Sequence, residues 1–252
     1  ERILTPAPPL ICTMSIIRQC WVFFTLAAIV LGIASTVLVI VATLLPSWIQ
    51  YSVTTGATVS HYTYLSRDRG LLWEEVTPKG NEYENKRFSL FVPQKNERTS
   101  TVGESIMILR WITASSFIGP QCIILVTLMV YVCCTVAIRR SSEKWPLRSG
   151  QYLSITSSSI FLFCALLQAL ALILLDITLV YETLNKCASI GNTQSGWPDK
   201  INDATQMKRG LGLLLAWVAV LSNFAGFLVL LIASGLNKQP KLSTTAEETL
   251  RH

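Results

Sequence analysis

The sequence predicts an all-α transmembrane four-helix bundle that carries a small extracellular antiparallel β-sheet. Three observations support this fold class. Only 14% of the residues are charged and the mean hydropathy is +0.46, whereas soluble domains carry about 25% charged residues. The charges are absent from four long stretches. Between the first two of the apolar segments lies a long polar region with β-favouring sequence.

The charge-free stretches are long enough to cross a bilayer. They lie between Arg18 and Arg67, Arg110 and Arg139, Arg148 and Asp176, and Arg209 and Lys238. The last three contain 28, 27 and 28 residues. A helix of that length reaches about 40 Å, more than the hydrocarbon thickness of about 30 Å. Because a charge at the centre of a membrane helix costs about 2.5–3.5 kcal/mol, this pattern predicts four spans.

The predicted segments follow from these stretches and their flanks. In chain order we expect a cytoplasmic N-terminus at 1–21, span one at 22–45, a large extracellular loop with β-strands at 46–115, span two at 116–138, a short basic cytoplasmic loop at 139–152, span three at 153–175, a second extracellular loop at 176–209, span four at 210–236 and a cytoplasmic tail at 237–252. Pro120 either starts or kinks the second span. The first methionine is Met14, so we expect residues 1–13 to lie outside the native chain; a cleaved signal peptide is the alternative.

The orientation is predicted from the basic residues. The link at 139–150 contains four basic residues and one acidic residue. Such a density of Lys and Arg marks a cytoplasmic loop, which places both termini in the cytoplasm of a multi-pass plasma-membrane protein. Arg110, Lys208 and Arg209 adjoin the spans on the opposite side and run against this assignment.

The large loop reads as a folded element. Four β-favouring stretches occur in it, at 48–53, 59–64, 71–76 and 88–92. Polar turn residues separate them, so they predict a small antiparallel sheet on the bundle, to which the second outer loop adds an edge strand.

Several functions are disfavoured by composition. The net charge of +6 does not indicate nucleic-acid binding, because the 49–110 region has eight basic against seven acidic residues and no basic stripe. The seven cysteines form no CxxC motif, and His61 and His252 are the only histidines. We therefore expect no metal site and no cofactor. The spans hold no central charge, and no Walker or Gly-x-Ser-x-Gly motif is present, so we expect no enzyme.

A combination of motifs then suggests a family. Trp48 ends span one, Gly70-Leu71-Leu72-Trp73 lies in the first outer loop, and Arg110 precedes span two in the sequence IMILRW at 106–111. Together with four spans and a larger first loop, this resembles the claudin and peripheral myelin protein superfamily over residues 14–237. Within that superfamily the chain is most similar to the divergent invertebrate Clc-like group.

The chain departs from the family pattern in two places. The family motif reads Gly-Leu-Trp followed by a cysteine pair, whereas here one Leu is inserted and both cysteines are absent. The chain ends in ETLRH at 248–252, which does not suit a PDZ pocket, so a PDZ scaffold is not an expected partner.

Trp48, Trp73 and Arg110 are the leading candidate residues. The resemblance implies that the two tryptophans are buried beneath the loop sheet and tie it to the bundle; an interfacial belt residue and a loop-core residue are the plainer alternatives. Arg110 is either a specific partner for loop carbonyls or a carboxylate, or an arginine that snorkels at a helix end.

Two further groups carry alternative readings. The resemblance makes Glu74 and Glu75 candidate pore or selectivity residues, although a solvated, charge-balanced loop is the favoured interpretation. Cys133, Cys134 and Cys20 are juxtamembrane candidates for reversible S-palmitoylation, with packing inside a helix as the alternative.

Polar and small residues inside the spans are expected to face protein. Gln121, Gln168 and Asn223 belong to the first group. The second group comprises Ser154, Thr156, Ser157, Ser158, Ser159, Gly210, Gly212, Ala225 and Gly226. Ordinary bundle packing is expected for them, with an oligomer seam as the alternative.

We therefore expect a non-enzymatic claudin-like protein that acts in cell–cell junctions or adhesion, or in a paracellular barrier or pore. Its expected partners are the lipid bilayer and other copies of itself or of claudin-like proteins, in cis or trans. The alternative is an auxiliary subunit that changes the trafficking or gating of an ion channel or receptor. A tetraspanin-type organiser is disfavoured, because the larger loop comes first.

Overall fold

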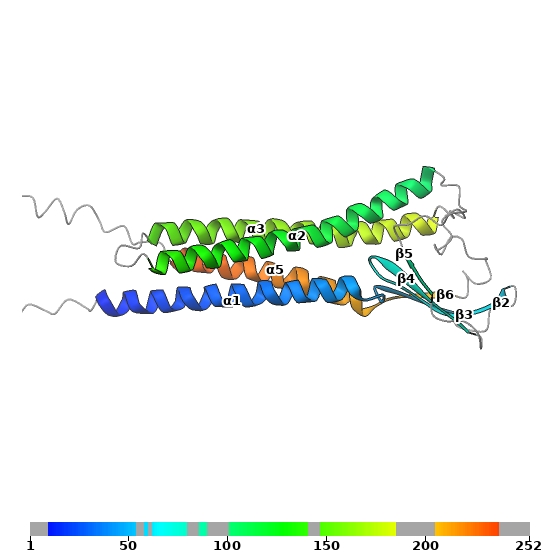
Figure 1. Ribbon diagram of the computed structural model, residues 1–252, viewed down its shortest axis with the longest axis horizontal. Helices are drawn as coiled ribbons and strands as arrows, with labels where there is room; N and C mark the ends of the chain where they lie inside the picture. Colours follow the sequence, from blue (N-terminus) through cyan, green and yellow to red (C-terminus); the bar gives the residue numbers. More distant parts are fainter. Residues whose placement is uncertain are drawn as a thin grey trace, which may run out of the picture. The chain divides into compact units, whose positions relative to one another are not determined.

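Four long helices and a set of short strands make up the part of the chain that the computed structural model describes, residues 10–53, 58–59, 62–79, 86–89, 101–140, 147–184 and 205–236. The helices are α1 (Leu10–Leu44), α2 (Thr101–Arg140), α3 (Leu147–Leu184) and α5 (Leu211–Leu236) (Figure 1).

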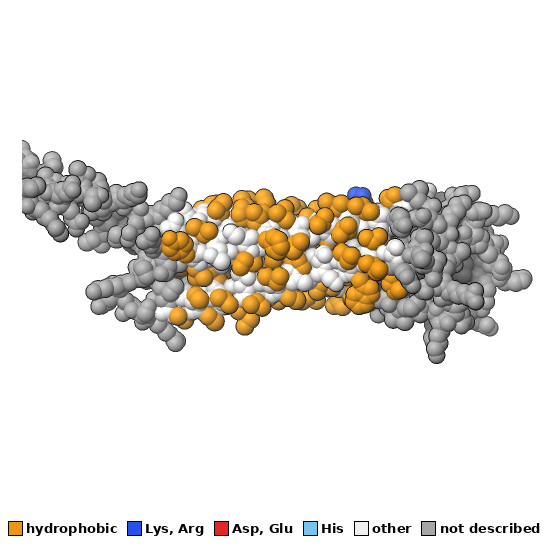
Figure 2. Space-filling model, turned by 90° about the horizontal axis from the view of Figure 1, so that it is seen from above, with side chains coloured by type: hydrophobic (Ala, Val, Ile, Leu, Met, Phe, Trp, Pro, Cys, Tyr) orange, Lys and Arg blue, Asp and Glu red, His pale blue; other side chains and the backbone are white. Residues whose placement is uncertain are grey.

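Each of the four helices contains a segment long and apolar enough to span a membrane. These segments are Gln19–Leu44, Met107–Ala137, Gly150–Val180 and Leu211–Leu236, with 26, 31, 31 and 26 residues. Large apolar side chains cover much of their surface (Figure 2), and Val30, Val126 and Leu221 are each more than 60% exposed. Water would solvate such a surface poorly, whereas lipid covers it without cost. The prediction of four apolar spans is confirmed.

Three helices extend beyond the predicted spans. Helix α1 begins at Leu10, whereas span one was placed at 22–45. Span two was placed at 116–138, but α2 already begins at Thr101, so residues 101–115 are helical and not part of an extended loop. Gly103 lies in the first turn of α2, and no Gly or Pro follows it until Gly119, so the helix continues without interruption over this stretch. Pro120 lies inside α2 and does not start it. Helix α3 continues past Leu175 to Leu184, since a single carboxylate at Asp176 does not end a helix.

The strands form one antiparallel sheet. They are β1 (Ile49–Val53), β2 (Thr58–Val59), β3 (Tyr62–Arg69), β4 (Trp73–Lys79), β5 (Lys86–Ser89) and β6 (Thr205–Arg209). The order is β5-β4-β3-β1-β6, and β2 pairs with the beginning of β3. Strand β6 comes from the second loop and pairs with β1 along its whole length. The predicted loop sheet and its edge strand from the second loop are therefore confirmed; residues 90–92 of the last predicted stretch lie outside the described residues.

The chain divides into two units, and every long helix contributes to both. Unit 1 comprises Glu1–Ile33, Ile123–Phe163 and Ser222–His252, and unit 2 comprises Ala34–Cys122 and Cys164–Leu221. In unit 1, the ring of fully buried Phe161 lies against Gly32 and Gly226, where an added Cβ would come within 3.3 and 2.8 Å of it. Small residues thus let three helices of this unit approach one another closely.

Unit 2 contains the sheet and the larger apolar core. Sixteen buried side chains form one cluster there. It joins Trp48, Ile49, Tyr51 and Leu71 from the loop region to apolar residues on the four helices, among them Phe117, Leu172 and Leu213. One face of the sheet region is thereby fixed to the helix ends of this unit.

Candidate functional site

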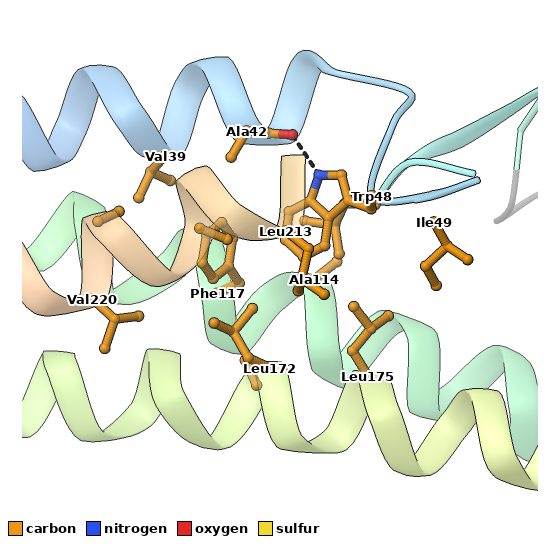
Figure 3. Close-up of a cluster of buried hydrophobic side chains, with 14 of the residues drawn as sticks. Val39, Ala42, Trp48, Ile49, Ala114, Phe117, Leu172, Leu175, Leu213 and Val220 are labelled. Atoms are coloured by element: carbon orange, nitrogen blue, oxygen red, sulfur yellow. Dashed lines mark hydrogen bonds between the residues drawn. The ribbon is translucent and has the colours of Figure 1, made fainter. Parts of the chain in front are cut away.

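The turn between α1 and β1 is built around Trp48. Helix α1 ends at Leu44, and Pro46 has no N–H with which to continue it. The chain turns back so that the Trp48 indole N–H donates to the carbonyl of Ala42 (Figure 3). The acceptor is a carbonyl of the last turn of α1, which also accepts from the Leu45 N–H at 3.3 Å. The indole is 1% exposed and meets the ring of Phe117 edge-on, with centroids 5.4 Å apart.

Backbone hydrogen bonds hold this turn from both loops. The Trp48 N–H donates to Arg69 O at 3.0 Å, and the Gly210 N–H donates to Trp48 O at 2.9 Å. The Gly212 N–H donates to Ser47 O at 2.8 Å. Residues 47 and 48 are therefore bonded both to the end of β3 and to the start of α5. We call the residues Ser47, Trp48, Gly70, Gly210 and Gly212 the loop anchor.

The glycines of the loop anchor lie so close to neighbouring backbone and ring atoms that no side chain fits at these positions. A Cβ at Gly70 would lie 2.7 Å from Leu45 O. A Cβ at Gly212 would lie 2.8 Å from the Trp48 indole nitrogen, and one at Gly210 would overlap Ser47 O. Real Cβ atoms do not approach backbone or ring atoms this closely, so only glycine lets the two loops meet at the turn.

The Gly70–Trp73 motif forms the tight connection between β3 and β4. The Gly70 N–H donates to Trp73 O at 2.8 Å, which closes the turn. Leu71 is buried in the core cluster, and the adjacent Leu72 packs against it. Trp73 is only partly buried and is not a member of the cluster. The inserted leucine is thus accommodated as an apolar contact, and of the two tryptophans Trp48 belongs to the buried cluster whereas Trp73 does not.

Two arginines of unit 2 are withdrawn from solvent. Arg110, in the N-terminal part of α2, is 8% exposed, and Arg69, at the end of β3, is 4% exposed. A snorkelling arginine would place its guanidinium in water, so the burial of Arg110 fits an arginine held against protein. Arg69 was not among the predicted site residues, because nothing in the sequence indicates that this charged loop residue is buried.

The face of the sheet that points away from the core carries a row of polar side chains. Residues directly opposite one another on adjacent strands project to the same face. The register aligns Lys208, Gln50, Asp68 and Glu75 across β6, β1, β3 and β4. Gln50 and Lys208 are exposed, and Asp68 and Glu75 are partly buried. We call these four residues the polar row.

Asp68 is the perturbed acid of the polar row. Burial raises the pKa of Asp68 above its ordinary value of 3.8, and the negative charge of Glu75 raises it further. A hydrogen bond from Gln50 acts in the opposite direction. The candidate selectivity residues Glu74 and Glu75 alternate along β4. Glu75 pairs with Asp68, and Glu74 pairs through its backbone with Arg69; the Glu74 side chain lies outside the described residues.

An ion pair ties the second loop to α3. Arg209 at the end of β6 lies 3.5 Å from Asp176, although both side chains are well exposed. Because exposed ion pairs contribute about 0–1 kcal/mol to stability, this contact adds little to the free energy of folding.

Buried polar side chains connect all four helices of unit 2. Gln121 Nε2 donates to Thr36 at 2.7 Å, and Gln121 Oε1 accepts from Ser35 at 3.3 Å and from Gln168 at 3.2 Å. Ser35 also donates to Ala219 O, and Gln168 to Phe117 O. We call Ser35, Thr36, Gln121 and Gln168 the glutamine network. Gln121, Gln168 and Asn223 are 3%, 0% and 0% exposed, which confirms that these polar residues face protein.

Unit 1 has polar contacts of its own and contains the candidate acylation sites. The Tyr131 hydroxyl lies 3.2 Å from Thr25 and 3.1 Å from Ser154. Cys133 is exposed, and Cys134 and Cys20 are partly buried. Among the described residues, no group of three or more His, Cys, Asp or Glu side chains is placed to hold a metal ion.

The sequence left the roles of Gly210 and Gly212 unrecognised. Both were expected to serve helix packing, but they contact the Ser47–Trp48 turn. Their signal was the position of a Gly-x-Gly at the junction between the second loop and the start of a span, where glycine permits a close approach of two backbones.

A comparison with protein families places these elements in a known group. The family model described as PMP-22/EMP/MP20/Claudin tight junction matches residues 33–231, which include the loop anchor, the polar row and the glutamine network. A search of curated proteins found no match.

Proposed function

Because the chain belongs to the PMP-22/EMP/MP20/claudin family, we propose that it is a non-enzymatic plasma-membrane protein whose loop sheet binds other copies of itself, or claudin-like proteins, at cell–cell contacts. The observation that carries this proposal is the loop anchor. It joins strands from both loops into one sheet and fixes them to the ends of the membrane-spanning helices.

The way in which the sheet is held suits a binding surface. Recognition surfaces lose less entropy on binding when they are rigid before contact. Here the cysteine pair that follows the family motif is absent. Backbone bonds join β3 to β4 and to the Trp48 turn, and the Trp48 side chain and close glycine contacts hold that turn against α1 and α5. This supports a sheet that is rigid enough for adhesion without a disulfide.

The proposed orientation places both loops outside the cell and both termini inside. The basic link at 139–150, with four Lys and Arg residues, supports a cytoplasmic position for the connection between α2 and α3. In this orientation the polar row is accessible to proteins in the same membrane and to proteins of a facing cell.

The test uses cells that form no junctions of their own. Two populations express the protein with differently coloured C-terminal fluorescent tags and are mixed with untransfected cells. We expect enrichment at contacts between two expressing cells and none where only one cell expresses the protein. A Trp48→Ala variant, matched by a Trp111→Ala variant at a half-exposed position of α2, separates loss of the loop anchor from the loss of any tryptophan.

A uniform surface distribution at all contacts would contradict the proposal. If the protein is then recovered in complex with one channel or receptor, and alters its surface amount or currents, the auxiliary-subunit alternative is supported instead.

A further inference from the structure

We propose that a groove between α1 and α2 in unit 1 binds one acyl chain of an anionic phospholipid. The site goes beyond the proposed function and does not depend on it, because every residue that lines the groove belongs to unit 1 and none belongs to the sheet.

The groove lies between the first part of the α1 span and the last part of the α2 span, and its volume is about 160 Å³. The lining residues Trp21 and Thr25 are buried, at 5% exposed each. Leu26, Val132 and Val136 also line it and are 57%, 38% and 45% exposed. Because all five residues lie within apolar spans, the groove opens toward lipid and not toward water.

The size and lining of the groove suit part of a hydrocarbon chain. A cavity of about 150 Å³ with apolar walls stays dry and binds benzene, so a groove of this volume has room for about six carbon atoms. A rigid sterol ring system is larger than this space. A flexible acyl chain can place a few of its methylene groups in the groove and leave the others in the bilayer. Atoms that face a void lack dispersion contacts on that side, and a bound chain restores them.

The hydroxyl group of Thr135, another lining residue, can bind the polar end of such a chain. Thr113, Thr127 and Thr178 each donate to the carbonyl four residues earlier in their helix. The buried Thr135 hydroxyl has no hydrogen-bond partner in the part of the chain that the structure describes. Rotation about the Cα–Cβ bond exchanges this hydroxyl with the methyl group without breaking a hydrogen bond. Since Thr135 lies two residues before the span ends at Ala137, the ester carbonyl of a phospholipid is an acceptor at the same depth.

Positive charges in the sequence flank the two spans at this end. Arg18 directly precedes the α1 span, which begins at Gln19. Arg139 and Arg140 are the second and third residues after the α2 span, which ends at Ala137. Lipid phosphates lie just outside the hydrocarbon core, where basic residues next to a span attract anionic headgroups. The expected ligand is therefore an anionic phospholipid.

Photo-crosslinking of the purified full-length protein tests the site. The protein is placed in nanodiscs of phosphatidylcholine that contain a small fraction of phosphatidylserine with a diazirine on one acyl chain. Mass spectrometry locates the labelled residues after illumination. We expect labelling at 21–29 and 132–136 to exceed that at the lipid-exposed residues Val126 and Leu221 about tenfold, which corresponds to a preference of about 1.4 kcal/mol.

A matched pair of variants tests the space itself. Val132→Phe fills the groove, whereas Val130→Phe adds the same ring at a half-exposed position of α2 that does not line it. We expect Val132→Phe to lower the labelling of 21–29 about tenfold and Val130→Phe to leave it unchanged. Thr135→Val keeps the shape and removes the hydroxyl, so it should lower the labelling about threefold, as loss of one hydrogen bond does.

The headgroup is tested with the same diazirine chain on phosphatidylcholine. We expect the phosphatidylserine probe to label the groove more strongly, and an Arg139→Gln/Arg140→Gln variant to remove the difference. Equal labelling of the parent by both probes would show that an anionic headgroup is not recognised.

The parent protein alone can overturn the site, whether or not the variants fold. Even labelling of all lipid-exposed positions would mean that the groove binds no particular chain. If a photoreactive sterol labels the groove and displaces the phospholipid probe, the occupant is a sterol and the proposed ligand is wrong. Thermal unfolding of each variant shows whether a loss of labelling reflects a loss of the fold.

Discussion

Trp48 combines three interactions in one side chain. Its indole fills a fully enclosed site, donates to Ala42 O and meets Phe117 edge-on. Removal of a buried aromatic side chain typically costs about 3–5 kcal/mol, while loss of a single hydrogen bond costs about 1 kcal/mol. We therefore expect Trp48→Ala to lower the thermal unfolding temperature in detergent strongly and Trp48→Phe only moderately. Equal effects of the two variants would mean that the aromatic packing contributes little.

The close contact at Gly212 can be tested against two control glycines that lie in helices without such a contact. A Cβ at Gly212 would collide with the Trp48 indole, whereas one at Gly119 or Gly235 would meet no described atom within 4 Å. We expect Gly212→Ala to destabilise the protein by about 1–3 kcal/mol through overpacking. Gly119→Ala and Gly235→Ala should be neutral or stabilise by up to about 1 kcal/mol, because alanine favours the helix. Thermal unfolding in detergent measures all three; destabilisation by the two controls would point to helix interfaces at those positions.

At the scale of single elements, the glutamine network links the four helices of unit 2 inside the span region. Interhelical hydrogen bonds in membrane proteins contribute about 0.6 kcal/mol on average and up to about 1.7 kcal/mol. Gln168→Leu removes the donor to Gln121 Oε1 and to Phe117 O. We expect Gln168→Leu to lower the free energy of unfolding by about 1–2 kcal/mol. Gln121→Leu should destabilise the Gln168→Leu variant less than it destabilises the parent, because the two residues share one hydrogen bond. Additive losses in a double-mutant cycle would show that the two side chains act independently.

The β3–β4 pair should respond to pH through Asp68. A folded-state pKa above 3.8 means that the folded sheet binds the proton more tightly than the unfolded chain. The sheet should therefore gain stability as the pH falls from neutral through the raised pKa, and the gain should level off below 3.8. Hydrogen exchange of the β3 and β4 amides, corrected for the intrinsic rate, measures this. In an Asp68→Asn variant these amides should already exchange slowly at neutral pH, and their protection should not change as the pH falls. If the variant keeps the pH dependence of the parent, a group other than Asp68 causes it.

The sequence predicted the elements better than the contacts between them. Charge-free length and hydropathy depend on composition, so the four spans were visible, and alternating β-favouring stretches marked the strands. Helix bounds were less visible, because residues 101–115 are polar enough for a loop and still helical. The contacts of Gly210 with Trp48 and of Gly212 with Ser47 join residues more than a hundred positions apart, which no local pattern encodes.

At the scale of the whole molecule, the protein is a multi-pass membrane protein of the claudin superfamily, and the position of each loop relative to the membrane decides what the sheet can bind. The four spans found in the described part of the chain place its two ends on one side of the membrane. Since β6 of the second loop pairs with β1 of the first, both loops must lie on the same side. These two conditions leave a single question, which is whether the basic link at 139–150 is inside or outside.

Single-epitope insertions answer that question in intact cells. We expect a tag near Glu82 in the first loop to bind antibody without permeabilisation, because four basic residues favour a cytoplasmic link and so an external sheet. A tag at the C-terminus or within 141–146 should bind antibody only after permeabilisation. Reversal of all three signals would invert the molecule and remove the sheet from any neighbouring cell. The four-span arrangement predicts that the tags at 141–146 and at the C-terminus lie on one side and the tag near Glu82 on the other. Any other combination of accessible tags would contradict that arrangement.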